Sequence, residues 1–323
     1  MRKIGVWALL GVGAFLLVAA LVARLWGYPA AQRTPLDTNS TTLLSGEASG
    51  VVVQVGDGEP QPVVGVNRTL ADADRSTDDA IVFGAYTCVA VDQDLAGPED
   101  YCLPGEDERI VTITTPSEGV TGAPDAFATD RRTAEALEND GLVPDGYEQK
   151  VGLINKWPFQ VEEKAYDVWD DVLGETVEAE FVGTEDVEGF ETYKFEYTVT
   201  DVPTEIAAGT DGTYSQHKVY WIDPTTGAII KQTQEETRVT ESGDVALDMA
   251  IGYTDETVQD NVETAESNGR MLALIGTWIP IVGGILGVAA ILTSVLLMTG
   301  GGRRRAPGHS SGSEQTSTLS LDK

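Results

Sequence analysis

Two long runs without a charged side chain stand near the two ends of this 323-residue chain. The first covers residues 4–23 and the second covers residues 271–298. Each run is long enough for a helix to cross a hydrocarbon layer of about 30 Å. The pattern therefore predicts two transmembrane helices, with a polar domain at residues 24–270 between them.

Between these runs, apolar and polar residues alternate as in strands that have one dry face and one wet face. The alternation is clearest at residues 190–199 and 245–253, and weaker at residues 177–182 and 229–239. The stretch VYWIDPTTGAIIKQ, residues 219–232, places an Asp-Pro-Thr-Thr-Gly turn between two strand-like runs, so we expect a β-hairpin there. The middle domain is thus predicted to be mainly β (α+β), with an antiparallel, curved sheet.

Two segments of the middle domain have helical patterns instead. We expect helices at residues 131–140 and 255–267, and the second leads into the run at residues 271–298. Residues 1–3 form a short end before the first span. Residues 299–323 form a tail rich in Gly, Ser and Thr, a composition typical of disordered segments.

A weak internal repeat is present in the middle domain. Asp130 and Thr133 in AFATDRRTAEAL have the same spacing as Asp223 and Thr226 in VYWIDPTTGAII. Two interpretations stay open. The repeat indicates either a duplicated sheet unit or only the turn-forming chemistry of Asp and Thr.

Basic residues beside the uncharged runs predict the orientation of the chain in a membrane. A triple arginine at residues 303–305 follows the second run, and Arg2 and Lys3 precede the first. We therefore expect a plasma-membrane protein with both termini in the cytoplasm and the middle domain outside the cell. A cleaved signal peptide is the alternative for residues 4–23, although an ordinary signal has a shorter core of about 7–15 residues.

The middle domain holds almost all of the acidic residues. Residues 25–270 carry 50 Asp and Glu against 14 Lys and Arg, a net charge of −36. Such a surface repels nucleic acid and anionic headgroups, so nucleic-acid binding is excluded. The charge indicates either a cation-binding surface or a solvated exterior adapted to high salt, and the second is the simpler interpretation.

The two cysteines, Cys88 and Cys102, both fall in the domain that we expect outside the cell. Disulfides persist in that compartment, so we expect the pair to close a local loop and to stabilise the fold by roughly 3 kcal/mol. A metal site is the weaker interpretation, because no histidine and no second cysteine pair lie near them.

The stretch at residues 157–199 carries a family resemblance. It contains Trp-Pro-Phe, Tyr-x-x-Trp-Asp, Gly-Thr-Glu and Gly-Phe-Glu-Thr-Tyr-x-Phe. With these motifs the chain resembles, over nearly its whole length, the actinobacterial and haloarchaeal envelope proteins called the porin PorA family. The resemblance implies an envelope protein and no catalytic residues. A transmembrane barrel does not fit this sequence, because the strands carry Glu, Asp and Lys and the predicted spans are helices.

Candidate catalytic chemistry is sparse. His217 and His309 are the only histidines, the middle domain has no Gly-x-Ser-x-Gly motif, and the chain has no phosphate-binding loop. The acidic run at residues 71–80 lacks the Gly and Glu of a helix–loop–helix calcium site, so a solvated turn is the simpler interpretation. We therefore expect no enzyme activity, no cofactor and no metal site.

Aromatic side chains supply the candidate ligand cleft. They gather at residues 157–169 and recur on one face of the strand-like stretch at residues 190–199. Two interpretations stay open, because such side chains fill the core of a β-rich domain as readily as they line a cleft. The candidate lining residues are Trp157, Phe159, Trp169, Tyr193, Phe195 and Tyr197.

Small residues in the second run favour close helix packing. Gly283 and Gly287 form a Gly-x-x-x-Gly step, which lets two helices approach closely. One interpretation is contact with the first run, which contains Gly5, Gly11 and Gly13. The other is a homo-oligomer formed through the same step.

A domain held at a membrane by both of its ends suits binding near the outer leaflet. We expect it to handle a lipid or another hydrophobic ligand. One alternative is a structural, adhesion or partner-binding scaffold without a small ligand, and a pore, as the family label suggests, is the least favoured interpretation. The layout also resembles that of the CD36-type scavenger receptors, although layout alone does not determine function. A lipid handler needs a continuous apolar hollow, whereas a scaffold needs only a packed core.

Overall fold

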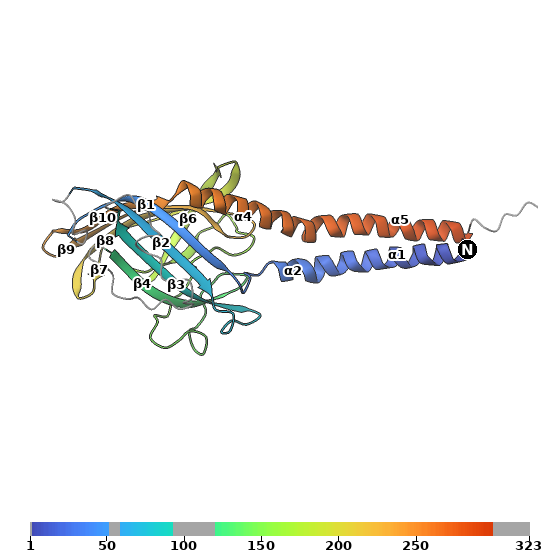
Figure 1. The fold of residues 1–323 in the computed structure, drawn as a ribbon, viewed down its shortest axis with the longest axis horizontal. Coiled ribbons are helices and arrows are strands. Elements are labelled where there is room, and N and C mark those ends of the chain that lie inside the picture. Colours follow the sequence, from blue (N-terminus) through green and yellow to red (C-terminus); the bar gives the residue numbers. More distant parts are fainter. Residues whose placement is uncertain (1, 52–58, 93–119, 300–323) are drawn as a thin grey trace, which may run out of the picture. The chain divides into compact units, whose positions relative to one another are not determined.

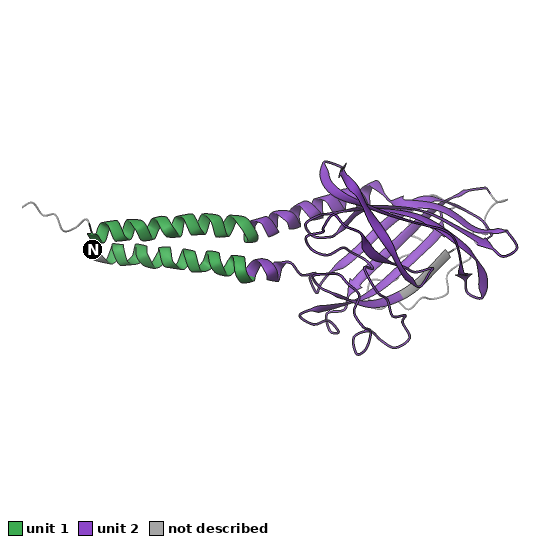
Figure 2. Ribbon diagram, turned by 180° about the vertical axis from the view of Figure 1, so that it is seen from behind, with its two compact units in different colours: residues 1–26, 275–323 green, residues 27–274 purple. Residues whose placement is uncertain are grey.

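The computed structural model describes residues 2–51, 59–92 and 120–299. The chain forms two compact units (Figure 2). One unit holds the terminal helices, from residues 1–26 and 275–323, and the other holds residues 27–274.

The first unit is built on helices α1 (Arg2–Val22) and α5 (Ile279–Thr299). Each belongs to a longer helical stretch, Ile4–Ala31 or Asp255–Thr299, which is long and apolar enough to cross a membrane. The first stretch continues through η1 (Ala23–Gly27) and α2 (Tyr28–Ala31), and the second contains η2 (Leu274–Trp278). Both stretches therefore exceed the expected spans at residues 4–23 and 271–298.

Small residues line the contact between α1 and α5. A Cβ atom added to Gly287 would lie 2.9 Å from the carbonyl oxygen of Gly13, and one added to Gly283 would lie 3.5 Å from Ala20. The Ser294 hydroxyl also donates a 3.0 Å hydrogen bond to the carbonyl oxygen of a residue in α1. The Gly-x-x-x-Gly step thus faces the first helix of the same chain, and a homo-oligomer stays a prediction.

The second unit is built on an antiparallel sheet that curls into a half-barrel, as the alternating pattern predicted (Figure 1). In the described residues the sheet has ten strands, in the order β4-β3-β2-β1-β10-β9-β8-β7-β6-β5. The strands are β1 (Asn39–Ser49), β2 (Gln61–Ala71), β3 (Ala80–Val91), β4 (Val120–Asp130), β5 (Tyr166–Asp170), β6 (Glu175–Val187), β7 (Phe190–Ala207), β8 (Thr210–Ile222), β9 (Ile229–Thr240) and β10 (Val245–Tyr253).

The expected strands all lie in this sheet. Residues 190–199 belong to β7, residues 245–253 form β10, and the hairpin at residues 219–232 joins β8 to β9. The first and last strands pair with each other, with Gly46 opposite Ile251. This pairing places both connections to the terminal helices in the middle of the sheet and leaves β4 and β5 as its edges.

Both faces of the sheet are covered near β8. Trp221 packs with Val258 of α4 (Asp255–Ala273), while its neighbour Tyr220 packs with Trp157 on the opposite face. Side chains alternate along a strand, so β8 contributes to two cores at once. The helix expected at residues 255–267 is confirmed as part of α4.

The helix expected at residues 131–140 is wrong. The Asp130 side chain accepts hydrogen bonds from the N–H groups of Arg132 and Thr133, both at 2.8 Å, and so closes a turn. Ala134 then has a φ of 60°, a left-handed conformation that ends a right-handed helix. After it the chain runs extended beside the end of β4.

That extended segment links the two edges of the sheet. Thr129 of β4 pairs with Ala136, Glu135 pairs with Leu153, and Leu153 pairs with Val168 of β5. The Ala136 N–H also donates a 2.8 Å hydrogen bond to the carbonyl oxygen of residue 152. We call this end of the half-barrel, where β1 begins and β10 ends, the closed end.

Candidate functional site

Three of the six candidate cleft residues belong to a packed core at the closed end. Trp157, Phe195 and Tyr197 belong to one hydrophobic cluster together with Tyr220. Trp157 is only 1% exposed, and its ring centroid lies 4.7 Å from that of Tyr220 and 5.6 Å from that of Phe195. These side chains fill the space beneath the sheet with one another, and contact with a ligand stays a prediction for them.

The other three candidate cleft residues lie at the margins of this core. The ring of Phe159 has the Lys156 ammonium 4.0 Å from its centroid. The Trp169 indole N–H donates a 2.9 Å hydrogen bond to Asp171, and the ring of Tyr193 lies 5.3 Å from an aromatic ring of β6. Each therefore already has a partner within the domain.

The turn of the β8–β9 hairpin holds Trp157 in place. Residues 153–161, which we call the plug segment, run along this turn. The main-chain N–H of Trp157 donates a 2.8 Å hydrogen bond to the Gly227 carbonyl oxygen. Two further main-chain hydrogen bonds join the plug segment to the turn, at 3.0 and 2.9 Å. Gly227 has a φ of 75°, and a Cβ atom there would lie 2.1 Å from the Trp157 carbonyl oxygen, so the contact requires glycine.

A buried carboxylate shapes the same turn. Asp223 is 1% exposed, and one of its oxygens accepts the Thr225 N–H at 2.8 Å. The other oxygen accepts the N–H and the hydroxyl of Thr226, at 3.2 and 2.5 Å. The Asp-x-x-Thr spacing seen in the sequence is thus a self-contained set of turn hydrogen bonds.

The same turn occurs elsewhere in the domain. At Asp72, Asp130 and Asp170, one carboxylate oxygen accepts the N–H groups two and three residues further along. Asp72 and Asp170 lie outside the weak sequence repeat, so turn chemistry accounts for that repeat without a duplication. The turn at Asp72 also falls in the acidic run at residues 71–80, as the simpler interpretation predicted.

Lys156 lies between the plug segment and the hairpin turn. Its ammonium donates hydrogen bonds to the carbonyl oxygens of Thr226 and Trp157, at 2.6 and 3.1 Å. Burial lowers the pKa of Lys156 to about 7, although the negative charge of Asp223 partly opposes the change. A lysine that loses its charge near neutral pH therefore sits at the contact that holds the core together.

A second buried polar group joins β5 to the middle of the sheet. Asp170 is 3% exposed, and the hydroxyls of Tyr197 and Tyr214 donate to the same one of its oxygens at 2.9 and 3.0 Å. Burial, together with the nearby carboxylate, raises the pKa of both tyrosines far above the usual range. Both hydroxyls thus stay protonated and act as donors.

Lys150 connects the two edge strands through charge. Its ammonium pairs with Asp125 of β4 at 3.2 Å and with Asp171 just after β5, and it lies 5.1 Å from the ring centroid of Trp169. Burial alone would lower the pKa of Lys150, but the two carboxylates more than offset it, so the pKa is raised. These two ion pairs reinforce the main-chain link between the edge strands.

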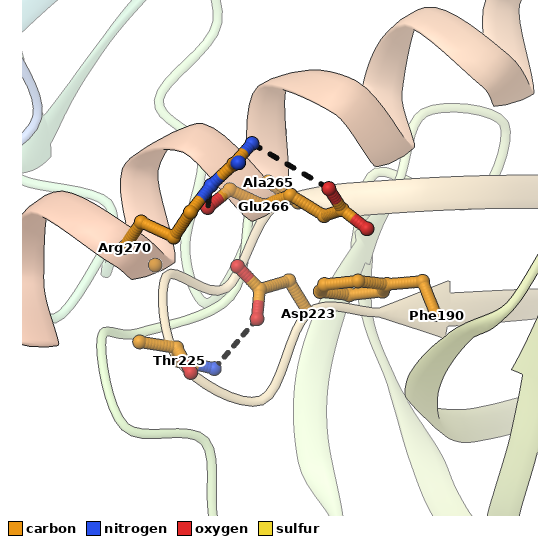
Figure 3. A pocket seen from close by; sticks show the side chains of 7 residues that line it. Phe190, Asp223, Thr225, Ala265, Glu266 and Arg270 are labelled. Atoms are coloured by element: carbon orange, nitrogen blue, oxygen red, sulfur yellow. Dashed lines mark hydrogen bonds and ion pairs between the residues drawn. The ribbon is translucent and has the colours of Figure 1, made fainter.

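An open groove of about 380 Å³ lies beside α4 at the same end of the sheet. Figure 3 shows the Phe190 ring, the Asp223 carboxylate and the paired side chains of Glu266 and Arg270 around it. The groove is lined by Phe190, Asp223, Thr225, Ala265, Glu266, Gly269 and Arg270. None of the six candidate cleft residues lines it.

The remaining candidates for chemistry stand apart from this groove. His217 is about half exposed and lies 3.8 Å from Glu196 on β7, while His309 falls outside the described residues. Cys88 is buried in β3, but Cys102 lies outside the described residues, so their pairing stays a prediction. In the described part of the chain no group of three or more His, Cys, Asp or Glu side chains is arranged to hold a metal ion.

Sequence reasoning missed the groove and the buried Lys156. The groove joins the start of β7, the hairpin turn and the end of α4, which are far apart in the chain. A local signal existed only for the turn, in its Asp-x-x-Thr-Gly spacing. The partners of that turn depend on the long-range docking of the plug segment.

A protein-family model matches most of the chain. The family model described as Porin PorA matches residues 7–296. No curated protein matches the chain. The matched range includes most of both apolar helices and the whole sheet domain.

Proposed function

The chain belongs to the Porin PorA family, and on that premise we propose that it is a membrane-held cell-envelope protein whose sheet domain binds a partner at the cell surface. Two helices long and apolar enough to cross a membrane flank this domain. The proposed orientation puts both termini in the cytoplasm and the domain outside, in keeping with the arginines at residues 303–305. Binding, rather than catalysis, is the proposed activity.

The closed end of the half-barrel is the observation that carries this proposal. A carrier of lipid needs an apolar hollow that its ligand can enter. At the end where the chain joins its helices, Trp157 and its neighbours fill the space, and Leu153 and Ala136 link the edge strands. This packing supports the scaffold alternative over the lipid-handling one.

The opposite end of the sheet is the proposed contact region for the partner. The β9–β10 turn lies there, with Ser242 and Asp244 exposed. The domain carries a net charge of −36 over residues 25–270, so its partner is proposed to have a neutral or basic surface. This charge complementarity would speed the association of the domain with its partner, and the attraction would weaken as salt is added.

Site-specific photocrosslinking on intact cells tests the partner. A photoreactive residue at position 242, in place of Ser242, is expected to give one defined crosslinked product. The control is a photoreactive residue in place of Arg132, which is exposed at the closed end. We expect no such product from position 132. Absence of a product at 242, or the same products at both positions, would contradict partner binding at the end of the sheet opposite the closed end.

A lipid-transfer assay tests the competing function. The full chain is reconstituted in donor vesicles, and movement of an acyl-chain-labelled lipid to acceptor vesicles is measured. We expect the labelled lipid to move at the same rate as it does from donor vesicles without the protein. A several-fold acceleration would favour lipid handling and would overturn the proposal.

A further inference from the structure

The groove beside α4 has a chemistry of its own. We propose that it binds the headgroup of a membrane phospholipid that carries both a phosphate and a primary ammonium group, as phosphatidylethanolamine does. This site is separate from the proposed partner-binding end. Such a site would bind a lipid through its headgroup without taking up an acyl chain.

The position of the groove in the chain supports a lipid ligand. Arg270 directly precedes the uncharged run that begins at Met271, and both residues lie in α4. With a rise of about 1.5 Å per residue, Glu266 lies roughly 6 Å from Arg270 along the helix axis. The groove therefore lies where a polar helix becomes an apolar one, which is where arginine and aromatic side chains meet lipid headgroups.

The phosphate of the headgroup is assigned to Arg270. Its side chain is 75% exposed and lies 3.5 Å from the Glu266 carboxylate, which is 52% exposed. An exposed pair of this kind contributes little to stability, so it can open without unfolding the helix. The freed guanidinium matches a phosphate with two parallel hydrogen bonds.

The ammonium of the headgroup is assigned to the acidic and aromatic side of the groove. Once its pair opens, Glu266 can accept hydrogen bonds from a primary ammonium. The Phe190 ring offers a face for a cation, and the buried Asp223 adds negative charge behind it. The groove thus holds two carboxylates and one guanidinium, an arrangement that selects a zwitterionic headgroup over an anionic one.

The size of the groove limits the ligand to a headgroup. Its volume of about 380 Å³ is near the lower end of small-molecule sites, which span roughly 300–1,000 Å³. Phosphatidylcholine has a similar charge, but its quaternary ammonium cannot donate a hydrogen bond to Glu266. Phosphatidylglycerol lacks a cation altogether. These two lipids are therefore the matched comparisons.

Native mass spectrometry of the full chain released from nanodiscs tests the proposal. The nanodiscs contain equal amounts of phosphatidylethanolamine, phosphatidylcholine and phosphatidylglycerol. We expect retained phosphatidylethanolamine to exceed each of the others at least fivefold. Arg270→Gln and Glu266→Gln should each reduce its retention at least fivefold, because both residues are exposed and their replacement leaves the fold intact.

Two control variants match these changes outside the groove. Glu263→Gln lies on the same helix and Arg75→Gln lies on the β2–β3 connection, and both should retain the lipid as the unchanged protein does. Equal retention of the three lipids, or retention unaffected by the groove variants, would overturn the proposal. So would binding of soluble phosphoethanolamine without retention of the lipid, because the ligand would then be a free phosphate compound.

Discussion

The main-chain N–H of Trp157 donates a 2.8 Å hydrogen bond to the carbonyl oxygen of Gly227. This bond joins the plug segment to the β8–β9 hairpin and places the Trp157 ring in the core at the closed end. The hairpin recognised in the sequence therefore has a structural task beyond reversing the chain. It holds the residues that fill the half-barrel.

Replacement of Gly227 should release this contact. The change Gly227→Ala puts a methyl group 2.1 Å from the Trp157 carbonyl oxygen, in a backbone conformation with a φ of 75°. We expect the free energy of unfolding to fall by about 3 kcal/mol or more. Urea unfolding of the full chain in detergent, followed by tryptophan fluorescence, measures the loss.

Gly243→Ala is the matched control for that change. Gly243 also has a positive φ, 89°, but a Cβ atom there meets nothing within 4 Å. Only the backbone penalty remains, roughly 1–2 kcal/mol. Equal losses for the two variants would show that the Trp157 contact is not what Gly227 protects.

The stability of the domain should depend on pH through Lys156. Its pKa falls from an ordinary 10.5 to about 7 on folding. Because folding lowers this pKa, between pH 7 and 10.5 Lys156 is protonated in the unfolded chain and neutral in the folded chain. The free energy of unfolding is therefore highest above pH 10.5 and decreases as the pH falls toward 7. Between pH 9.5 and 7.5 we expect the free energy of unfolding to fall by about 2–3 kcal/mol from this group.

Lys156→Met should remove this dependence, because methionine does not titrate. Lys164→Met is the control, since Lys164 is exposed and pairs with Glu162 at the surface. Unfolding curves at pH 7.5, 8.5 and 9.5 give the slope for each protein. An unchanged slope in Lys156→Met would contradict the assignment.

The two tyrosines that share one oxygen of Asp170 should act together. Removing either hydroxyl, by Tyr197→Phe or Tyr214→Phe, takes a donor from a buried carboxylate and should cost about 1–3 kcal/mol of stability. The double variant should differ from the sum of the two by at least about 0.5 kcal/mol. A double-mutant cycle of unfolding free energies measures this coupling, and strict additivity would argue against a shared acceptor.

Acidic side chains face each other on the neighbouring strands β6 and β7, so the stability of the domain should depend on salt concentration. Glu180 lies opposite Glu196, and the acidic residues Asp186 and Glu191 are also paired. Such pairs destabilise a sheet, and salt screens them. We expect the thermal midpoint to rise with added KCl.

Glu180→Lys should replace one repulsion with an attraction. At low salt it should stabilise the domain by about 0.2–1 kcal/mol, and the gain should shrink in concentrated KCl. Glu241→Lys, in the β9–β10 turn, adds the same charge without an opposing strand residue. A similar gain in both variants would indicate an effect of net charge alone.

The proposed orientation predicts which side of the membrane each part of the chain faces. A cysteine introduced at Thr184, which is exposed on β6, should react with a membrane-impermeant thiol reagent on intact cells. A cysteine introduced at Ser310 should be protected until the cells are opened. The unchanged protein measures the background from Cys88 and Cys102, and the reverse labelling pattern would invert the topology.

Local periodicity was enough to predict the kind of elements that this chain forms. The uncharged runs at both ends and the period-two alternation at residues 190–199 and 245–253 indicated helices and strands, because each pattern reports which faces of a segment avoid water. The Asp-x-x-Thr spacing indicated turns, because those hydrogen bonds form within a few residues. The same logic failed at residues 131–140, where the turn at Asp130 overrides the helical composition.

Only the tertiary structure decided what these elements enclose. Aromatic side chains at residues 157–169 have the same pattern whether they line a cleft or fill it, and the docking of Trp157 on Gly227 placed the Trp157 ring in a packed core. The pairing of β1 with β10, the linked edges of β4 and β5 and the groove beside α4 all join residues far apart in the chain. Such contacts depend on how the whole sheet curls and closes, which no local pattern of hydrophobic and polar residues specifies.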